Sequence, residues 1–488
     1  MIDVNKDQLV PVATSRRQFT ALLCAGGAIA LTGCGGGSAA APEPVIVLPP
    51  QIVLQPQALT ADIGQTATLR VEASGTSPAY QWRRNGVAIA GANASTLVLV
   101  VQATDHEARF SVQVSNQAGS VTSAEAELTL PLMSHIRTGI NVLAGQIGST
   151  DAAQDSVGEL ARFGATGRIC SDSRGNLYVV DTSNSTLRKV TPFGVVTTLL
   201  RDFPSDSAVA VDAQGNYYGV RNRTIVKVAP DGAQSVLAGV PGVLGYADGP
   251  GAQATFAKPN ALAIDSQGNL LVADAAEIVI TGNVGPNLFT VDHVFGGTVR
   301  KILSTGVVST VAGTIGRTIS GAASFGVDGA HVPASVDRTS DLLQPNAIAC
   351  DQLGNIYVSD WLAANVKRFD AAGRIEVLAT GYAESLYHYR IGGLVLAGSE
   401  GLYYHDAISV HLSGPVYTGD RVVLKRVGPS GVVEVVAGGE SDERKLGSLP
   451  GAFGSEAGPT RLLNGLAAGP GRSVWCCWGN AVLLVGLS

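Results

Sequence analysis

A short motif recurs along the second half of this chain and limits the folds it can adopt. In each copy an apolar segment ends in Asp, a tight turn containing Gly-Asn follows, and a second apolar segment leads away. Clear copies occupy residues 170–181, 209–218, 262–274 and 348–360. A unit this short cannot bury its apolar face alone, so repeated units must stack on one another. We therefore expect a repeat architecture from residue 135 onward.

Each unit continues into a second hairpin, which raises the number of strands per unit to four. The second hairpins are clearest at residues 186–199, 298–313 and 423–438. Four short strands per unit, repeated around an axis, are typical of a β-propeller. Two degraded copies, at 394–406 and 465–478, bring the number of units to six. The sequence thus predicts an all-β chain whose bulk is a six-bladed propeller.

The residue pattern of the repeat resembles that of a known protein family. The first unit contains Gly175-Asn176-Leu177-Tyr178-Val179, then Asp181, then the strand Leu187-Arg188-Lys189-Val190. It is similar to the repeat of NHL proteins. The resemblance covers roughly residues 135–488 and is specific in at least four units. It implies a propeller that acts as a binding scaffold.

The two ends of the repeat region complement each other. The last unit ends at residues 481–485 and lacks a fourth strand, whereas residues 140–145 match the fourth strand of other units. We expect residues 135–145 to complete the last blade, because closure removes exposed strand edges that promote aggregation.

Residues 1–34 are expected to direct export. Arg16-Arg17 with Phe19 precedes a short apolar run, which resembles the twin-arginine signal. Leu31-Thr32-Gly33-Cys34 resembles a lipobox, so Cys34 is expected to carry lipid; a plain cleaved signal and an uncleaved anchor are the alternatives. Residues 35–50 are rich in Gly, Ala and Pro, which predicts a flexible linker. We expect a cell-envelope protein, in the periplasm or at the outer membrane, held to the membrane only by lipid.

Residues 51–131 predict an immunoglobulin-like β-sandwich. Short alternating strands are separated by turn signals such as Asn85-Gly86. Trp82 and the segment after Asp105 resemble strands C and F of that family, with Phe110 at the corner tyrosine. Val71 and Val112 stand where the bridging cysteines would be, so we expect Trp82 to pack on these two valines.

Composition narrows the function. The net charge of −6 and the absence of Lys or Arg runs argue against nucleic acid as a partner. Cys170, Cys350, Cys476 and Cys477 show no metal-binding spacing and are expected to be free thiols. No cofactor motif is present in the sequence, and no cofactor is expected.

Long insertions mark one face of the predicted propeller. Residues 275–297 and 407–421 follow second strands, and residues 314–343 and 439–463 follow fourth strands, so all four fall on the same face. Long loops in a compact domain are usually functional, although drift in tolerant loops is the alternative.

At that face, the repeat register aligns one residue per unit at the mouth of the innermost strands. These residues are Gly167, Ser207, Asn260, Asn346, Gly392 and Asn464. Three asparagines on one rim can hydrogen-bond a polar ligand, and they can equally serve the turns at strand entries. The charged side chains expected near the same level are Arg168, His388 and Arg390.

Two sets of residues resemble catalytic groups without the arrangement that catalysis needs. Asp181, Asp274, Asp360 and Asp406 recur at one place in the repeat, so we expect them to accept backbone hydrogen bonds rather than form a carboxylate ring. His405 and His411 are weak zinc candidates that lack a nameable third ligand.

The sequence therefore favours a binding protein whose propeller face takes a protein, peptide or glycan. The alternatives are a metal-assisted lyase or hydrolase, similar to a lactonase, acting at the propeller axis, and a purely structural envelope component. A cluster of His, Asp or Glu on the inner strands would favour the enzyme, and a polar rim would favour binding.

Overall fold

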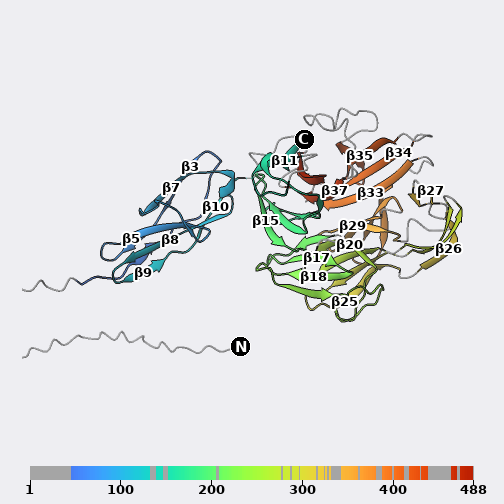
Figure 1. Cartoon of the computed structure of the whole chain (residues 1–488), viewed down its shortest axis with the longest axis horizontal. Helices are drawn as coiled ribbons and strands as arrows, with labels where there is room; N and C mark the ends of the chain where they lie inside the picture. Colours follow the sequence, from blue (N-terminus) through green and yellow to red (C-terminus); the bar gives the residue numbers. More distant parts are fainter. Residues whose placement is uncertain are drawn as a thin grey trace, which may run out of the picture. The chain divides into compact units, whose positions relative to one another are not determined.

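The fold is derived from a computed structural model, in which short strands dominate (Figure 1). It describes residues 46–131, 139–146, 152–204, 208–275, 278–285, 288–295, 297–314, 317–323, 325–326, 329–330, 342–360, 363–380, 387–397, 401–411, 417–428, 430–437, 463–469 and 473–486. The two helices found in these residues are single 3-10 turns, η1 (Ala103–Asp105) and η3 (Gly158–Leu160). None of the described helices has the length and apolar character needed to cross a lipid bilayer. The predicted signal and Cys34 lie outside the described residues.

Residues 51–129 form a module built from three small sheets. Its strands are β1 (Gln51–Leu54), β2 (Leu59–Thr60), β3 (Thr66–Arg70), β4 (Glu72–Ser74), β5 (Ala79–Arg84), β6 (Val87–Ala88), β7 (Thr96–Val100), β8 (Ala108–Asn116), β9 (Gly119–Thr122) and β10 (Ala126–Thr129). The largest sheet runs β2-β10-β8-β5-β6 with β9 on β8, and β3-β7 and β1-β4 form two more. Asn85 and Gly86 join β5 to β6 with φ of 49° and 80°, as a two-residue hairpin requires.

Trp82 lies at the centre of this module. It is completely buried, in one apolar cluster with Val71 and Val112 as predicted. Its indole Nε1 donates a hydrogen bond to the Ala94 carbonyl oxygen at 2.9 Å, so the one polar atom of the ring is satisfied. Phe110, in the same cluster, is 1% exposed. Apolar contacts thus hold Val71, Trp82 and Val112 together in the core of this module.

Six four-stranded antiparallel sheets follow, and each is one blade of a propeller. Blades 1 and 2 are β12 (Thr166–Ser171), β13 (Leu177–Asp181), β14 (Thr186–Val190), β15 (Val196–Arg201), and β16 (Val209–Val211), β17 (Tyr217–Arg221), β18 (Thr224–Val228), β19 (Gln234–Ala238). Blades 3 and 4 are β20 (Lys258–Ile264), β21 (Leu270–Ala275), β24 (Thr298–Ile302), β25 (Val308–Gly313), and β29 (Pro345–Cys350), β30 (Ile356–Asp360), β31 (Asn365–Phe369), β32 (Ile375–Thr380). Blade 5 is β33 (Tyr387–Leu396), β34 (Leu402–His411), β35 (Tyr417–Val427), β36 (Val433–Ala437).

Blade 6 is closed by a strand from the other end of the propeller sequence. Its order is β37 (Leu463–Ala468), β38 (Ser473–Trp478), β39 (Ala481–Gly486) and β11 (Gly139–Gly145). Val142 pairs with Leu483 and Ala144 with Val482, and Figure 1 shows β11 beside the C-terminal end. The predicted closure is confirmed.

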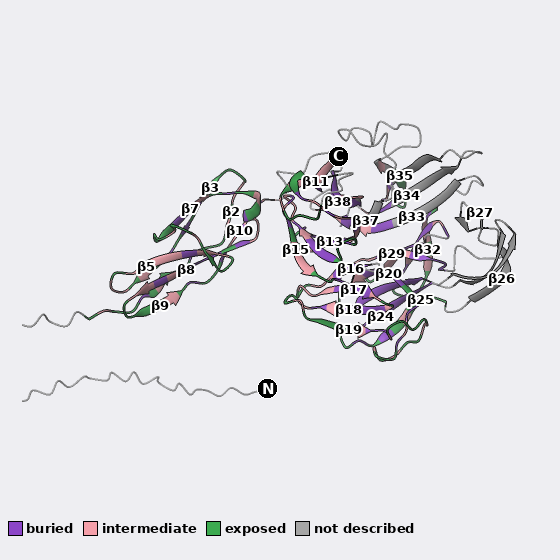
Figure 2. Ribbon diagram, viewed as in Figure 1, coloured by how far each residue is buried: buried purple, intermediate pink, exposed green. Residues whose placement is uncertain are grey.

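The innermost strands form a complete ring. Each contacts the next in the order β12, β16, β20, β29, β33, β37, and β37 contacts β12 again. Blades 1 and 4 therefore face each other across the axis. Figure 2 shows buried residues on inner and middle strands, such as β13, and exposed ones on outer strands, such as β19.

Three of the four insertions that we expected to be loops contain strands, and residues 439–462 of the fourth lie outside the described residues. β22 (Ile278–Gly285) and β23 (Leu288–Phe295) follow the second strand of blade 3, and β26 (Arg317–Ala323) follows its fourth strand. β23 pairs with β26, so the two insertions share one sheet on one face of the propeller, as predicted. In blade 5, β33, β34 and β35 are each 10 or 11 residues long, so residues 407–421 mostly extend the hairpin. Two smaller strands, β27 (Phe325–Gly326) and β28 (Gly329–Ala330), pair with each other.

The repeated Asp at the end of the second strands is structural where its side chain is described. Asp181 accepts from the backbone N–H groups of Gly164 and Ala165, at 3.0 and 3.2 Å. Asp274 and Asp360 accept in the same way from residues 257–258 and 343–344. Each holds the chain that enters its blade, as predicted; the side chain of Asp406 lies outside the described residues.

Candidate functional site

A channel of about 330 Å³ runs along the propeller axis. Four consecutive residues from each blade line it, all in the inner strand except Ala208 just before β16; they are 168–171, 208–211, 261–264, 347–350, 393–396 and 465–468. Each inner strand pairs with one neighbour only, so its other edge presents backbone N–H and C=O groups to the channel. The volume falls at the lower end of the range for small-molecule sites.

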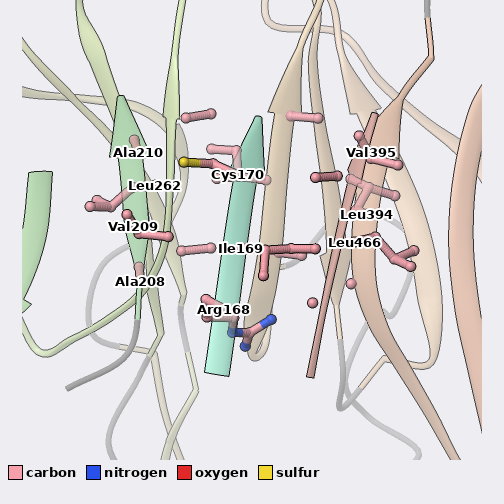
Figure 3. A pocket seen from close by; sticks show the side chains of 18 of the residues that line it. Arg168, Ile169, Cys170, Ala208, Val209, Ala210, Leu262, Leu394, Val395 and Leu466 are labelled. Carbon is pink, nitrogen blue, oxygen red and sulfur yellow. The ribbon is translucent and has the colours of Figure 1, made fainter. Parts of the chain in front are cut away.

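The wall of the channel is mainly aliphatic (Figure 3). One branched residue occupies the same repeat position in each blade and is 3–8% exposed; the six are Ile169, Val209, Leu262, Ile348, Leu394 and Leu466. Among the described lining residues, the polar side chains are those of Arg168 and Ser171 and the thiols of Cys170 and Cys350. Arg168 carries the one charge in this set.

The mouth of the channel is shaped by a β-bulge that recurs from blade to blade. The pairing of first and second strands is interrupted between Thr166 and Ile169, and in the same way around Asn260 and Asn346. Blades 5 and 6 show the same interruption, at residues 391–394 and 463–466. A bulged residue is released from the ladder and can be re-aimed, which is why bulges often occur beside binding sites. The residues that the sequence aligned at the mouth are thus the bulged ones in these five blades, and Ser207 lies outside the described residues.

Arg168 reaches across this mouth. Its Nη2 donates a hydrogen bond of 2.7 Å to Oδ1 of Asn346, although the two residues belong to opposite blades. Asn260, in the blade next to Asn346, donates from Nδ2 to the Pro345 carbonyl oxygen at 3.1 Å. The structure therefore brings together three of the six residues predicted for the site. Figure 3 shows Arg168 toward the lower end of β12 and Cys170 toward the upper end of the same strand.

The electrostatics of this mouth are unbalanced. Burial lowers the pKa of Arg168, yet a guanidinium keeps its proton in proteins. Within the described part of the chain its side chain has one polar contact, the neutral amide of Asn346. An amide oxygen satisfies a donor but does not neutralise the charge, so the described side chains at the mouth carry a net positive charge.

The remaining predicted residues are placed by their backbones only. His388 and Arg390 lie on β33, before the residues of that strand that line the channel, and Asn464 lies in the bulge of β37. His405 and His411 lie on β34. Their side chains are not described, so these five predictions stay untested. Among the described residues, no three His, Cys, Asp or Glu side chains gather as metal ligands.

Two thiols at the other end of the channel were not predicted as part of it. Cys170 and Cys350 line opposite blades, and the Cys350 thiol donates to the Ile264 carbonyl oxygen at 3.1 Å. Burial raises the pKa of Cys350 to about 11 and that of Cys170 further. Both thiols stay protonated near neutral pH. Their place just before Asp172 and Asp351 was the available signal, because that segment is an inner strand in every unit.

Comparison with known proteins leaves the family open. No family model matches the chain, and no curated protein matches it. Among solved structures, a protein of unknown function from Bacteroides thetaiotaomicron has a TM-score of 0.42 at 13% identity, over 91% of this chain and 98% of the other. A putative gluconolactonase gives 0.41 and 14%, over 71% and 98%. An auxiliary nutrient binding protein from Bacteroides thetaiotaomicron gives 0.40 and 11%, over 90% and 97%. These likenesses are too distant to bear on activity, and the fold is read from the six sheets themselves.

Proposed function

We propose that this chain is a binding protein that takes a polar ligand at the insertion-bearing mouth of its propeller. The observation that carries the proposal is the group formed by Arg168, Asn346 and Asn260 on bulges of three blades. A guanidinium and two amides offer several donors and acceptors with fixed positions, as a recognition site requires. A protein, a peptide or a glycan could each supply matching groups.

The chemistry of the channel favours binding over catalysis. Its described side chains are aliphatic groups, a hydroxyl, two protonated thiols and one guanidinium. A general acid or base near neutral pH needs a group that titrates there, and none of these does. The insertions of blade 3, joined through β23 and β26, add surface on the same side.

The setting we propose follows the sequence. An NHL-type propeller would be exported by the twin-arginine signal and anchored through lipid on Cys34. The module at residues 51–131 would be an immunoglobulin-like spacer. Its strands and its core around Trp82 support this assignment. The propeller would then present its mouth to ligands within the cell envelope.

The test is binding by the full chain to arrays of glycans and peptides. The double variant Asn260→Ala/Asn346→Ala removes both amides at the mouth, and Gln214→Ala/Gln267→Ala is the matched control at the exposed turns of the other face. We expect the mouth variant to lose at least about tenfold in affinity, because each lost hydrogen bond in a buried site weakens binding. The control should bind as the parent does.

Equal binding by parent and mouth variant would overturn the proposal, and an absence of any array ligand would rule out a protein, peptide or glycan as the partner. Metal analysis of the same preparation adds an independent check. Stoichiometric zinc or calcium together with hydrolysis of a lactone would replace the binding function with the metal-assisted enzyme.

A further inference from the structure

The position of Arg168 has a further consequence for what the channel binds. Its side chain spans the axis from blade 1 to Asn346 of blade 4, so it lies over the channel entrance rather than beside it. Behind it lie the six branched residues of the wall. A molecule that enters at this end meets a cation first and apolar surface next.

The contact between Arg168 and Asn346 can be exchanged. A carboxylate can accept two parallel hydrogen bonds from one guanidinium, whereas the Asn346 amide oxygen accepts one and carries no charge. A carboxylate that takes the place of the Asn346 oxygen would accept two guanidinium hydrogens and neutralise this half-buried charge. The Asn346 amide, released from Arg168, could then donate to the same carboxylate. Replacement of the Asn346 oxygen by a carboxylate thus gives Arg168 a charged partner and leaves the Asn346 amide with an acceptor.

The length of the wall sets the size of the apolar part. Four residues of an extended strand span about 10 Å between the first and last Cα, at ~3.3 Å per residue. A zigzag alkyl chain advances roughly 1.3 Å per carbon–carbon bond of about 1.5 Å. About eight carbons therefore match the distance from the level of Arg168 to that of Ser171, at the far end of the lining segment.

We propose that the channel binds an aliphatic monocarboxylate, whose carboxylate replaces Asn346 on Arg168 and whose hydrocarbon chain extends along the axis toward Cys170. The proposal rests on the binding function above, because it uses the same mouth. It specifies that function by naming an anionic headgroup and an apolar body.

The test is isothermal calorimetry with the full chain and the series butyrate, hexanoate, octanoate and dodecanoate. We expect one site per chain and an affinity that rises about fourfold per methylene. The rise should stop near octanoate, when the channel is full. Octanol and octylamine have the same body without the anion and should bind at least about tenfold more weakly than octanoate.

Three variants assign the headgroup site. Arg168→Gln removes the cation and should lose at least about tenfold in octanoate affinity. Asn346→Asp changes one group of the side chain and gives Arg168 a permanent carboxylate, so it should exclude octanoate while the melting temperature rises or stays constant. Arg201→Gln removes an exposed charge from β15, away from the channel lining, and should bind as the parent does.

Octanoate binding by Asn346→Asp at the affinity of the parent would overturn the proposal. Equal binding of octanol and octanoate, or many weak sites per chain, would do the same. Loss of binding in Arg201→Gln would show that charge on the surface is responsible. The two proposals fail separately: an array ligand that needs Asn260 and Asn346, in a protein that ignores octanoate, sinks only the monocarboxylate, whereas octanoate binding without an array ligand sinks only the macromolecular partner.

Discussion

Arg300→Met is a strong test of how the blades are held together. Arg300 is completely buried, and its Nη1 lies 3.6 Å from Oδ2 of Asp274, which is also completely buried. The same guanidinium donates to Asp248 and lies over the Phe256 ring, 5.3 Å from its centroid. Methionine fills similar space without charge. Because removal of one partner leaves an uncompensated buried charge, we expect the free energy of unfolding to fall by about 3–5 kcal/mol.

The geometry of Asp274 also indicates which second substitution should restore the stability lost in Arg300→Met. Oδ1 of Asp274 accepts from both the Ala257 and the Lys258 backbone N–H groups, at 3.1 and 2.7 Å. Oδ2 also accepts from the Ala257 N–H, at 3.1 Å, and is the oxygen that faces Arg300. An asparagine at 274 keeps both bonds through its single oxygen and carries no charge. The double variant Arg300→Met/Asp274→Asn should therefore recover to within about 1–2 kcal/mol of the parent, which makes it about 2–3 kcal/mol more stable than Arg300→Met alone.

The effect should depend on pH with a definite sign. Burial raises the pKa of Asp274 to about 7, although backbone hydrogen bonds and Arg300 oppose the rise. In Arg300→Met that opposition weakens. The folded state holds a proton that the unfolded state releases, and in Arg300→Met it does so up to a higher pH than in the parent. Stability should therefore increase as the pH falls from 8 toward 5, and more in the variant than in the parent. The double variant has no such group and should show no such gain.

The assay is urea unfolding followed by tryptophan fluorescence and circular dichroism, with midpoints compared at constant m. Arg201→Met, at an exposed position, controls for the loss of one positive charge. A loss below about 1 kcal/mol in Arg300→Met, or no rescue by Asp274→Asn, would refute the view that the Asp–cation pair stabilises the blade.

Three further predictions test the turns, the closure and the anchor. Burial raises the pKa of Asp351, but hydrogen bonds within the turn hold it below its usual value. The folded protein therefore loses stability as the pH falls below about 4. Asp351→Asn should reduce this loss at acid pH, as measured by urea unfolding at a series of pH values. Gly145→Ala should cost more than Gly268→Ala in urea unfolding, because φ is positive at both but only at 145 would a Cβ meet neighbouring backbone; equal costs would contradict a tightly packed closure. Cys34→Ser should move the expressed protein from the detergent phase to the aqueous phase in phase partitioning; an unchanged distribution would exclude the lipid anchor.

The blades could be predicted from the sequence because the contacts that shape each turn join residues close together in the chain. In the turn of blade 4, Asp351 accepts from the Asn355 backbone and side chain and from the Tyr357 hydroxyl, all within six residues. Such contacts can be recognised without knowing the fold. The closure by residues 140–145 was predictable for the same reason, since that segment keeps the pattern of a fourth strand.

The contacts that define the mouth are not local. Arg168 and Asn346 are 178 residues apart and meet only because blades 1 and 4 of a six-membered ring face each other. Repeat alignment placed both at one level but could not show that a side chain would cross the axis. The strands β22, β23 and β26 were also missed. They pair with one another outside the blade pattern, so no repeat reveals them.

The scaffold and the mouth use different positions of the same repeat, so their chemistry can vary independently. The Asp that ends the second strand fixes the backbone of the entering chain and recurs as Asp181, Asp274 and Asp360. The bulge beside it carries arginine in one blade and asparagine in two others. The extra residue of a bulge is left unpaired in the ladder, whereas the strand-end Asp is fixed by backbone hydrogen bonds. Under the proposed function, stability would be determined at the strand ends and ligand choice at the bulges, so a substitution at a bulge would change the charge of the channel while the strand-end contacts remain.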